Sequence, residues 1–142
     1  MIIYLFYSIA ITFLLRQEQI IDLNDLRWSY RIICIEALDK SSIEKQINEL
    51  CKSEKEIDDR KLKILVKSNN EYFEGCLMNK LSFIKNFPPN KSNHNFSVSL
   101  IGLDGGKKSS WHKPVQPTEI FKLIDTMPMR INEMRNGKNP KK

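Results

Sequence analysis

Three cysteines are the side chains of this sequence that could carry nucleophilic or redox chemistry: Cys34, Cys51 and Cys76. They lie far apart, so no Cys-x-x-Cys motif is present, and their odd number leaves at least one thiol unpaired within the chain. Cys34 lies in a β-branched apolar run and Cys51 on the apolar face of a predicted helix, so we interpret both as small buried hydrophobic residues. Cys76 lies in a stretch without clear periodicity, and it is the cysteine on which the alternative of thiol chemistry rests.

The two histidines, His94 and His112, could serve as bases or metal ligands. Neither has a second histidine or a cysteine at ligand spacing, so the sequence predicts no metal site and no cofactor. Ser109 and Ser110 precede His112, which pairs the residue types of a nucleophile and a base. Neighbouring residues of a strand point to opposite faces, however, and we therefore expect a solvated strand here.

The first half of the chain has the pattern of a strand, a helix and a second strand. Residues 31–38 (RIICIEAL) open with a continuous β-branched apolar run, which is typical of a strand buried on both faces. Apolar residues then recur at helical spacing over 43–57, with Ser41 and Ser42 as predicted N-caps. Residues 61–67 are a second apolar strand. The pattern predicts a βαβ unit with parallel strands and a right-handed crossover.

The second half predicts a hairpin and a closing helix. We expect a helix over part of 71–86 and a loop over 88–95. Residues 96–102 alternate as a strand does, and Asp104-Gly105-Gly106 is a hairpin turn that leads into a strand over 107–111. A helix begins at Pro117, is interrupted at Pro128 and ends near Gly137. A βαβ unit followed by ββα, with a mixed central sheet flanked by helices, is the thioredoxin-like α/β arrangement.

Length and charge set the broad class. The chain has 142 residues, 41% apolar and 28% charged, which fits one globular domain and excludes wholesale disorder, collagen and coiled coil. Residues 130–142 carry +4 of the formal net charge of +6. We interpret 136–142 as a solvated basic tail. The alternative is a polyanion- or membrane-surface-binding tail, but no aromatic residue is interleaved to stack on bases. No motif indicates sequence-specific nucleic-acid binding.

Residues 1–15 carry no charged side chain. This run is shorter than the roughly 20 residues of a spanning helix and fits the apolar core of an export signal. No basic residue precedes it, and the alternative is a buried segment of the mature fold. We predict an export signal or an uncleaved N-terminal anchor over 1–19, with membrane association through this segment, and a domain over 20–135. Export to the periplasm or cell envelope follows; without a signal the protein would be cytoplasmic.

Four stretches carry a resemblance: LRWSYR at 26–31, Asp59-Arg60, LIGLDGGKK at 100–108 and IDTMPMRINEM at 124–134. Together they resemble the bacterial family called domain of unknown function 4174, over roughly 23–135. That family is related to thioredoxin-like domains of secreted vertebrate matrix and sushi-repeat proteins. The resemblance implies a thioredoxin-like fold and, commonly, export, but no established reaction.

Thioredoxin-like enzymes need a thiolate at the N-terminus of the helix after the first strand, where the helix end lowers its pKa. Residues 37–42 contain no cysteine. We therefore expect a binding or structural module rather than an enzyme, with an unknown protein or an anionic ligand as its partner. The alternatives are a thiol-dependent antioxidant or oxidoreductase that uses Cys76, and polyanion or membrane-surface binding through the tail.

Topology predicts that a polar set of residues gathers at one end of the sheet, away from the usual redox position. The starts of two parallel strands, the hairpin turn and the end of the last helix all meet there. The set could be a clamp of ion pairs, which we favour, or a recognition site in which an unpaired arginine binds an anion or a partner's carboxylate. Its members are Arg31, Asp59, Arg60, Asp104, Gly105, Gly106, Asp125 and Arg130.

Overall fold

The computed structural model describes residues 18–90 and 94–138. Its elements are β1 (Ile20–Asp22), the 3₁₀ helix η1 (Leu23–Leu26), β2 (Arg31–Ala37), α2 (Lys40–Cys51), α3 (Glu54–Asp59), β3 (Leu62–Ser68), β4 (Glu71–Glu74), β5 (Asn79–Leu81), β6 (Phe83–Lys85), β7 (Phe96–Ile101), β8 (Lys107–Trp111), α4 (Pro117–Asp125) and α5 (Pro128–Lys138). The predicted export segment lies almost entirely outside the described residues, as does the end of the basic tail. Within the described residues, no helix combines the length and apolar character needed to cross a membrane.

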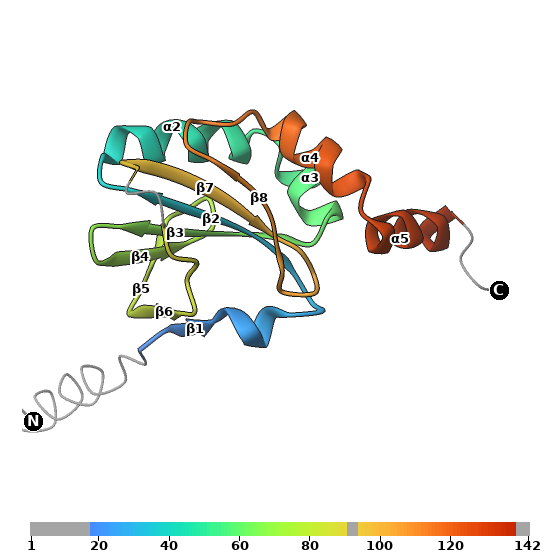
Figure 1. The fold of residues 1–142 in the computed structure, drawn as a ribbon, viewed down its shortest axis with the longest axis horizontal. Helices are drawn as coiled ribbons and strands as arrows, with labels where there is room; N and C mark the ends of the chain where they lie inside the picture. The colour runs from blue at the N-terminus through green and yellow to red at the C-terminus, as the bar shows by residue number, and fades with distance from the viewer. Residues whose placement is uncertain (1–17, 91–93, 139–142) are drawn as a thin grey trace, which may run out of the picture.

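A six-stranded sheet in the order β5-β4-β3-β2-β7-β8 forms the centre of the molecule (Figure 1). β2 and β3 are parallel and are joined through α2 and α3, as a βαβ unit requires. β7 is antiparallel to β2, β8 is antiparallel to β7, and α4 follows. This βαβ unit followed by ββα confirms the predicted thioredoxin-like α/β fold.

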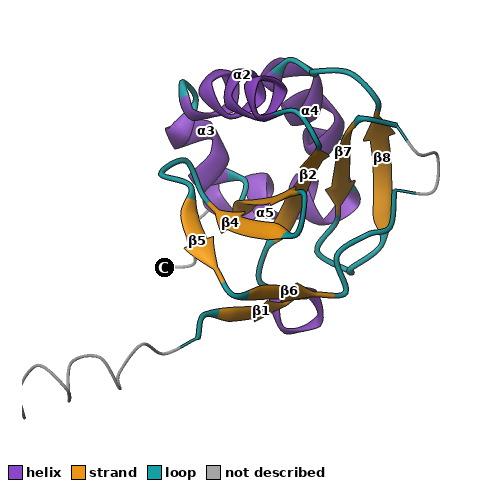
Figure 2. Ribbon diagram, turned by 90° about the vertical axis from the view of Figure 1, so that its left-hand side faces the viewer, coloured by secondary structure: helices purple, strands orange, loops and turns teal. Residues whose placement is uncertain are grey.

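The sheet has a different cover on each face (Figure 2). On one face α2, α3 and α4 pack through Ile47, Ile57 and Ile120 against the larger apolar cluster. On the other face η1 and the two-stranded β1–β6 ribbon cover a smaller cluster that includes Leu23 and Ile84. Side chains of β7 contribute to the apolar clusters on both faces of the sheet, because successive side chains of a strand point to opposite faces.

The segment 71–86 is not a helix, so that prediction is wrong. It forms the short strands β4, β5 and β6. Tyr72 lies on the smaller cluster and Phe73 against the larger one, which is the period of two of a strand. Turns at Gly75 (φ +72°) and Met78 (φ +52°) break the segment into pieces too short to show that period clearly.

The helix starts and stops differ in part from the predictions. α2 is capped by Asp39, not by Ser41 or Ser42: the Asp39 carboxylate accepts hydrogen bonds from both of their backbone N–H groups. Pro117 is the first-turn proline of α4, as predicted, and Pro128 begins a new helix. α5 reaches Lys138, the last described residue, which lies one residue beyond the predicted stop at Gly137.

Candidate functional site

Arg60 is the centre of the predicted polar set. It follows α3 directly and is 8% exposed. Its guanidinium meets the Asp125 carboxylate with both oxygens engaged, Nε to Oδ1 at 3.0 Å and Nη2 to Oδ2 at 2.6 Å, and it also donates to the Glu56 carboxylate at 2.5 Å. Desolvation lowers the pKa of Arg60, but its hydrogen bonds to Asp125 and Glu56 outweigh this and raise the pKa above its usual value. Arg60 therefore fastens the end of α4 to the start of β3.

Arg130 joins α5 to the same group and is 5% exposed. It donates to the Asp59 carboxylate, to the Asp59 carbonyl at 2.8 Å and to Asp125 Oδ1 at 3.3 Å. Asp125 is thus shared by Arg60 and Arg130, and the planar fork of each arginine suits this shared pairing.

Arg31, the first residue of β2, is 1% exposed and completes the network. Its Nη1 and Nη2 donate to the two carboxylate oxygens of Glu133 at 3.2 and 3.3 Å, and Nη1 also donates to the Arg60 carbonyl at 2.9 Å. Its Nε is buried without a partner among the described residues.

The hairpin turn lies beside this network but is not part of it. Asp104 accepts from Lys108 Nζ at 2.6 Å and from the Gly106 N–H at 3.0 Å. The hydrogen bond from Lys108 is the main reason that the pKa of Asp104 is below its usual value. Gly105 adopts φ +78°, as the predicted turn requires. Asp104 and Arg31 line the same cavity of about 320 Å³, so the turn and the arginines do share one end of the molecule.

Each buried arginine has a carboxylate partner. Topology brings together Arg31, Asp59, Arg60, Asp125 and Arg130, and the structure adds two carboxylates that the sequence analysis missed, Glu56 and Glu133. Their positions were readable: Glu56 lies four residues before Arg60, and Glu133 lies three after Arg130 on a helix. We call these seven residues the arginine clamp. The geometry favours its structural interpretation, and the recognition interpretation stays a prediction.

The thiols are arranged differently from the expectation. Cys51 and Cys76 form a disulfide between the last residue of α2 and the turn after β4. Cys76 is therefore not the free thiol that the alternative of thiol chemistry requires. Cys51 is a disulfide cysteine and not simply the small buried hydrophobic residue that we predicted. The bond lies at the C-terminal end of α2, where the helix dipole disfavours a thiolate.

Cys34 is the free cysteine of the described residues. It is 2% exposed in the middle of β2, as predicted, and burial raises the pKa of its thiol. A thiol that is both buried and protonated is a poor nucleophile.

The position of a redox thiolate, at the N-terminus of α2, holds Asp39 instead. Its carboxylate accepts hydrogen bonds from the hydroxyl groups of Ser41 and Ser42, at 2.8 and 2.7 Å, as well as from their N–H groups. These bonds lower the pKa of Asp39 to about 2, with the Ser42 hydroxyl as the largest cause. The Ser41 and Ser42 N–H groups at the start of α2 are thus already hydrogen-bonded to the Asp39 carboxylate.

The Asp39 cap predicts a pH dependence of stability. Because the pKa is lowered from 3.8 to about 2 on folding, the stabilisation is complete above about pH 4 and is lost as the pH falls toward 2. In urea titrations, the difference in denaturation midpoint between wild-type and Asp39→Ala protein should decrease as the pH is lowered from about 4 toward 2. Asp39→Asn is the control, since it caps without titrating. A gap that is equal at neutral and acidic pH would contradict this role.

The two histidines lie together, which their sequence spacing did not show. The His94 and His112 rings are 3.9 Å apart between centroids. Within residues 18–90 and 94–138, no three or more His, Cys, Asp or Glu side chains are grouped as metal ligands would be.

The protein is a thioredoxin-like α/β domain. The N-terminus of α2, where a redox thiolate would lie, is capped by Asp39, and the arginine clamp lies at the opposite end of the sheet. The family model that matches is the domain of unknown function 4174 (DUF4174), over residues 22–133, and the chain belongs to this family. Comparisons with curated proteins and with solved structures gave no match.

Proposed function

We propose that this protein is an exported, non-catalytic module that binds or holds a partner on a thioredoxin-like scaffold. One observation carries the proposal: in the described residues every cysteine is either in a disulfide or buried, and the helix start that would activate a thiolate is occupied by Asp39. A stable scaffold without an accessible thiolate is suited to binding and not to thiol exchange.

The disulfide supports the exported part of the proposal. Disulfides persist in oxidising compartments such as the periplasm and are rare where glutathione and thioredoxin keep thiols reduced. The uncharged apolar run over residues 1–15 is a second and independent reason, because it has the length of the apolar core of an export signal. This segment would be removed on export or would anchor the domain at the membrane.

Export is tested by producing the full chain in a Gram-negative bacterium and separating cytoplasm, periplasm and membranes. We expect the protein in the periplasmic or membrane fraction, with Cys51 and Cys76 protected from maleimide until a reductant is added. Cytoplasmic protein with both thiols free to react would overturn the exported assignment.

Thiol titration of the purified native protein tests the non-catalytic part. We expect no reaction with Ellman's reagent in the folded state and one reactive thiol, Cys34, in denaturant without reductant. A thiol that reacts within seconds in the folded protein would contradict the proposal.

A further inference from the structure

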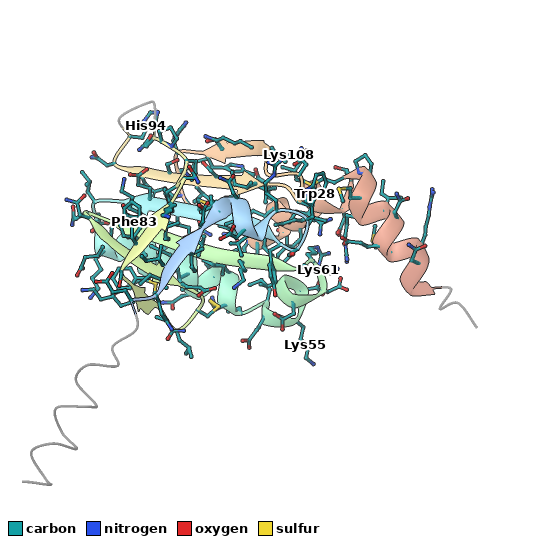
Figure 3. The ribbon with its side chains drawn as sticks, turned by 90° about the horizontal axis from the view of Figure 1, so that it is seen from below. Trp28, Lys55, Lys61, Phe83, His94 and Lys108 are labelled. Carbon is teal, nitrogen blue, oxygen red and sulfur yellow. A yellow bond between two sulfur atoms is a disulfide. The ribbon has the colours of Figure 1, made fainter. Side chains whose placement is uncertain are left out.

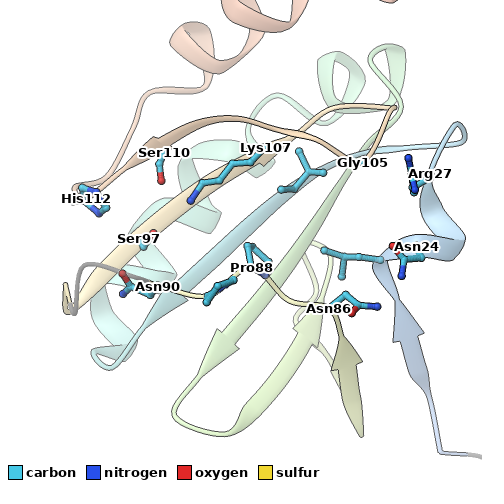
Figure 4. Close-up of a pocket in the computed structure, with 13 residues that line it drawn as sticks. Asn24, Arg27, Asn86, Pro88, Asn90, Ser97, Gly105, Lys107, Ser110 and His112 are labelled. Atoms are coloured by element: carbon cyan, nitrogen blue, oxygen red, sulfur yellow. The ribbon is translucent and has the colours of Figure 1, made fainter.

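A cleft of about 640 Å³ opens on the sheet face that carries η1, opposite the face covered by α2, α3 and α4 (Figure 4). The edge of the sheet at β7 and β8 forms one side, and η1 with the segment 86–90 forms the other. Small-molecule sites in proteins typically enclose roughly 300–1,000 Å³, so the cleft has the size of one.

The charge of the lining has a single sign. The charged side chains that line the cleft are Arg27 and Lys107, both cationic, and no Asp or Glu is among its described lining residues. Neither Arg27 nor Lys107 forms an ion pair within the described part of the chain: Arg27 Nε donates to the Asp104 carbonyl, at 3.1 Å. This separates the cleft from the arginine clamp, where each guanidinium already meets a carboxylate.

Two carboxylates next to lining residues make contacts of their own. Asp104 pairs with Lys108 at 2.6 Å. Asp22 accepts hydrogen bonds from the Asn24 N–H and the Asn86 amide, at 2.9 and 2.8 Å. Lys108 neutralises Asp104, whereas Asp22 keeps its charge outside the lining. Arg27 and Lys107 can attract an anion because they line the cleft itself, and a concave setting concentrates the field of charges of one sign.

The remaining polar lining consists of amides and hydroxyls, from Asn24, Asn86, Asn90, Ser97 and Ser110. Such groups both donate and accept, so they match hydroxyl or amide groups of a ligand. Figure 4 shows Lys107 extending over the strands toward Ser97 and His112, while Arg27 and Asn24 lie at the other end. Leu23 and Ile101 supply an apolar part of the wall.

Gly105 leaves room for the Arg27 side chain at one end of the cleft. A Cβ at this position would approach Arg27 Nε to 2.7 Å and Cδ to 2.9 Å, and the φ of +78° already disfavours other residues. The absence of a side chain at Gly105 lets Arg27 lie against the hairpin turn.

From this arrangement we propose that the cleft binds a small organic anion, a phosphate or carboxylate on a hydroxyl-bearing body. Lys107 and Arg27 supply the charge-assisted hydrogen bonds, and the amides and hydroxyls hold the body. The inference rests on the proposed function and deepens it by naming a ligand class for the binding module.

The test uses the full chain and three probes: ribose 5-phosphate, gluconate and uncharged ribose. Binding is followed by chemical shifts of the backbone amides of Gly105 and Ser110 in two-dimensional NMR spectra. We expect one or both anions to shift these amides saturably, and ribose to bind at least about tenfold more weakly. Which anion binds identifies phosphate or carboxylate as the recognised group.

Three variants locate the site. Lys107→Gln and Arg27→Gln should each weaken anion binding about tenfold. Lys55→Gln is the matched control, because Lys55 projects from α3, outside the cleft (Figure 3), and it should change affinity less than twofold. No saturable shift with either anion, equal binding of ribose, or an equal loss in Lys55→Gln would overturn the proposal. Thiol titration and fractionation would be unaffected by such a failure, so the proposed function is tested separately.

Discussion

Replacing Arg31 by alanine should reduce the free energy of unfolding by about 3 kcal/mol, the lower end of the cost of breaking a buried ion pair from one side, because Glu133 is 24% exposed and still contacts Arg130. Arg31 is 1% exposed, so its removal leaves a cavity at the start of the central strand. It also takes away both hydrogen bonds to the Glu133 carboxylate and the donor to the Arg60 carbonyl. Urea or guanidinium denaturation followed by circular dichroism measures the change.

Arg135→Ala is the matched control, because Arg135 is an exposed arginine of α5, and we expect its effect to stay within about 0.5 kcal/mol. Glu133→Gln should lie between the two variants, since the amide retains one acceptor for Arg31. A loss below about 1 kcal/mol in Arg31→Ala would mean that the clamp does not hold the fold together, and it would favour recognition as the role of these arginines.

Removal of the Cys51–Cys76 disulfide is expected to have a similarly large effect. The two cysteines are 25 residues apart, and the loop-entropy relation gives about 3.5 kcal/mol for a loop of this length. The bond ties α2 to the turn between β4 and β5, which are short strands at the edge of the sheet. Reduction should therefore lower the denaturation midpoint markedly.

The double variant Cys51→Ala/Cys76→Ala separates the disulfide from other effects of the reductant. Its free energy of unfolding should match that of reduced wild-type protein to within about 1 kcal/mol, and its denaturation midpoint should not respond to reductant. Equal midpoints for oxidised and reduced wild-type protein would show that the bond adds no stability.

The central elements could be predicted because their residues carry local signals. Residues 32–35 are a continuous apolar run in the middle of the sheet, and Asp104-Gly105 marks the hairpin between β7 and β8. From the order of these elements, topology alone placed Arg31, Arg60 and Asp125 at one end of the molecule. That step needed no contact information, since parallel strands begin at the same edge of a sheet.

The remaining features depend on contacts that sequence spacing does not encode. The pairing of Cys51 with Cys76 joins a helix end to a turn, and disulfide connectivity cannot be deduced from the sequence alone. In the turn between β4 and β5, Gly75 was a local signal that the sequence analysis did not use, whereas the positive φ of Met78 occurs at a residue that rarely adopts it and had no signal. The cleft was missed because its walls come from η1, segment 86–90, β7 and β8, which are distant in the sequence.

The proposed function depends on the absence of a reactive thiolate from this thioredoxin-like domain. Its most direct test is mass spectrometry of the full chain after brief exposure to hydrogen peroxide, with each cysteine quantified over time. The structure predicts that Cys34 stays unmodified while the protein is folded and that the Cys51–Cys76 bond stays intact, because the one is buried and the other already oxidised. Rapid and selective oxidation of any one cysteine in the folded protein would contradict the account.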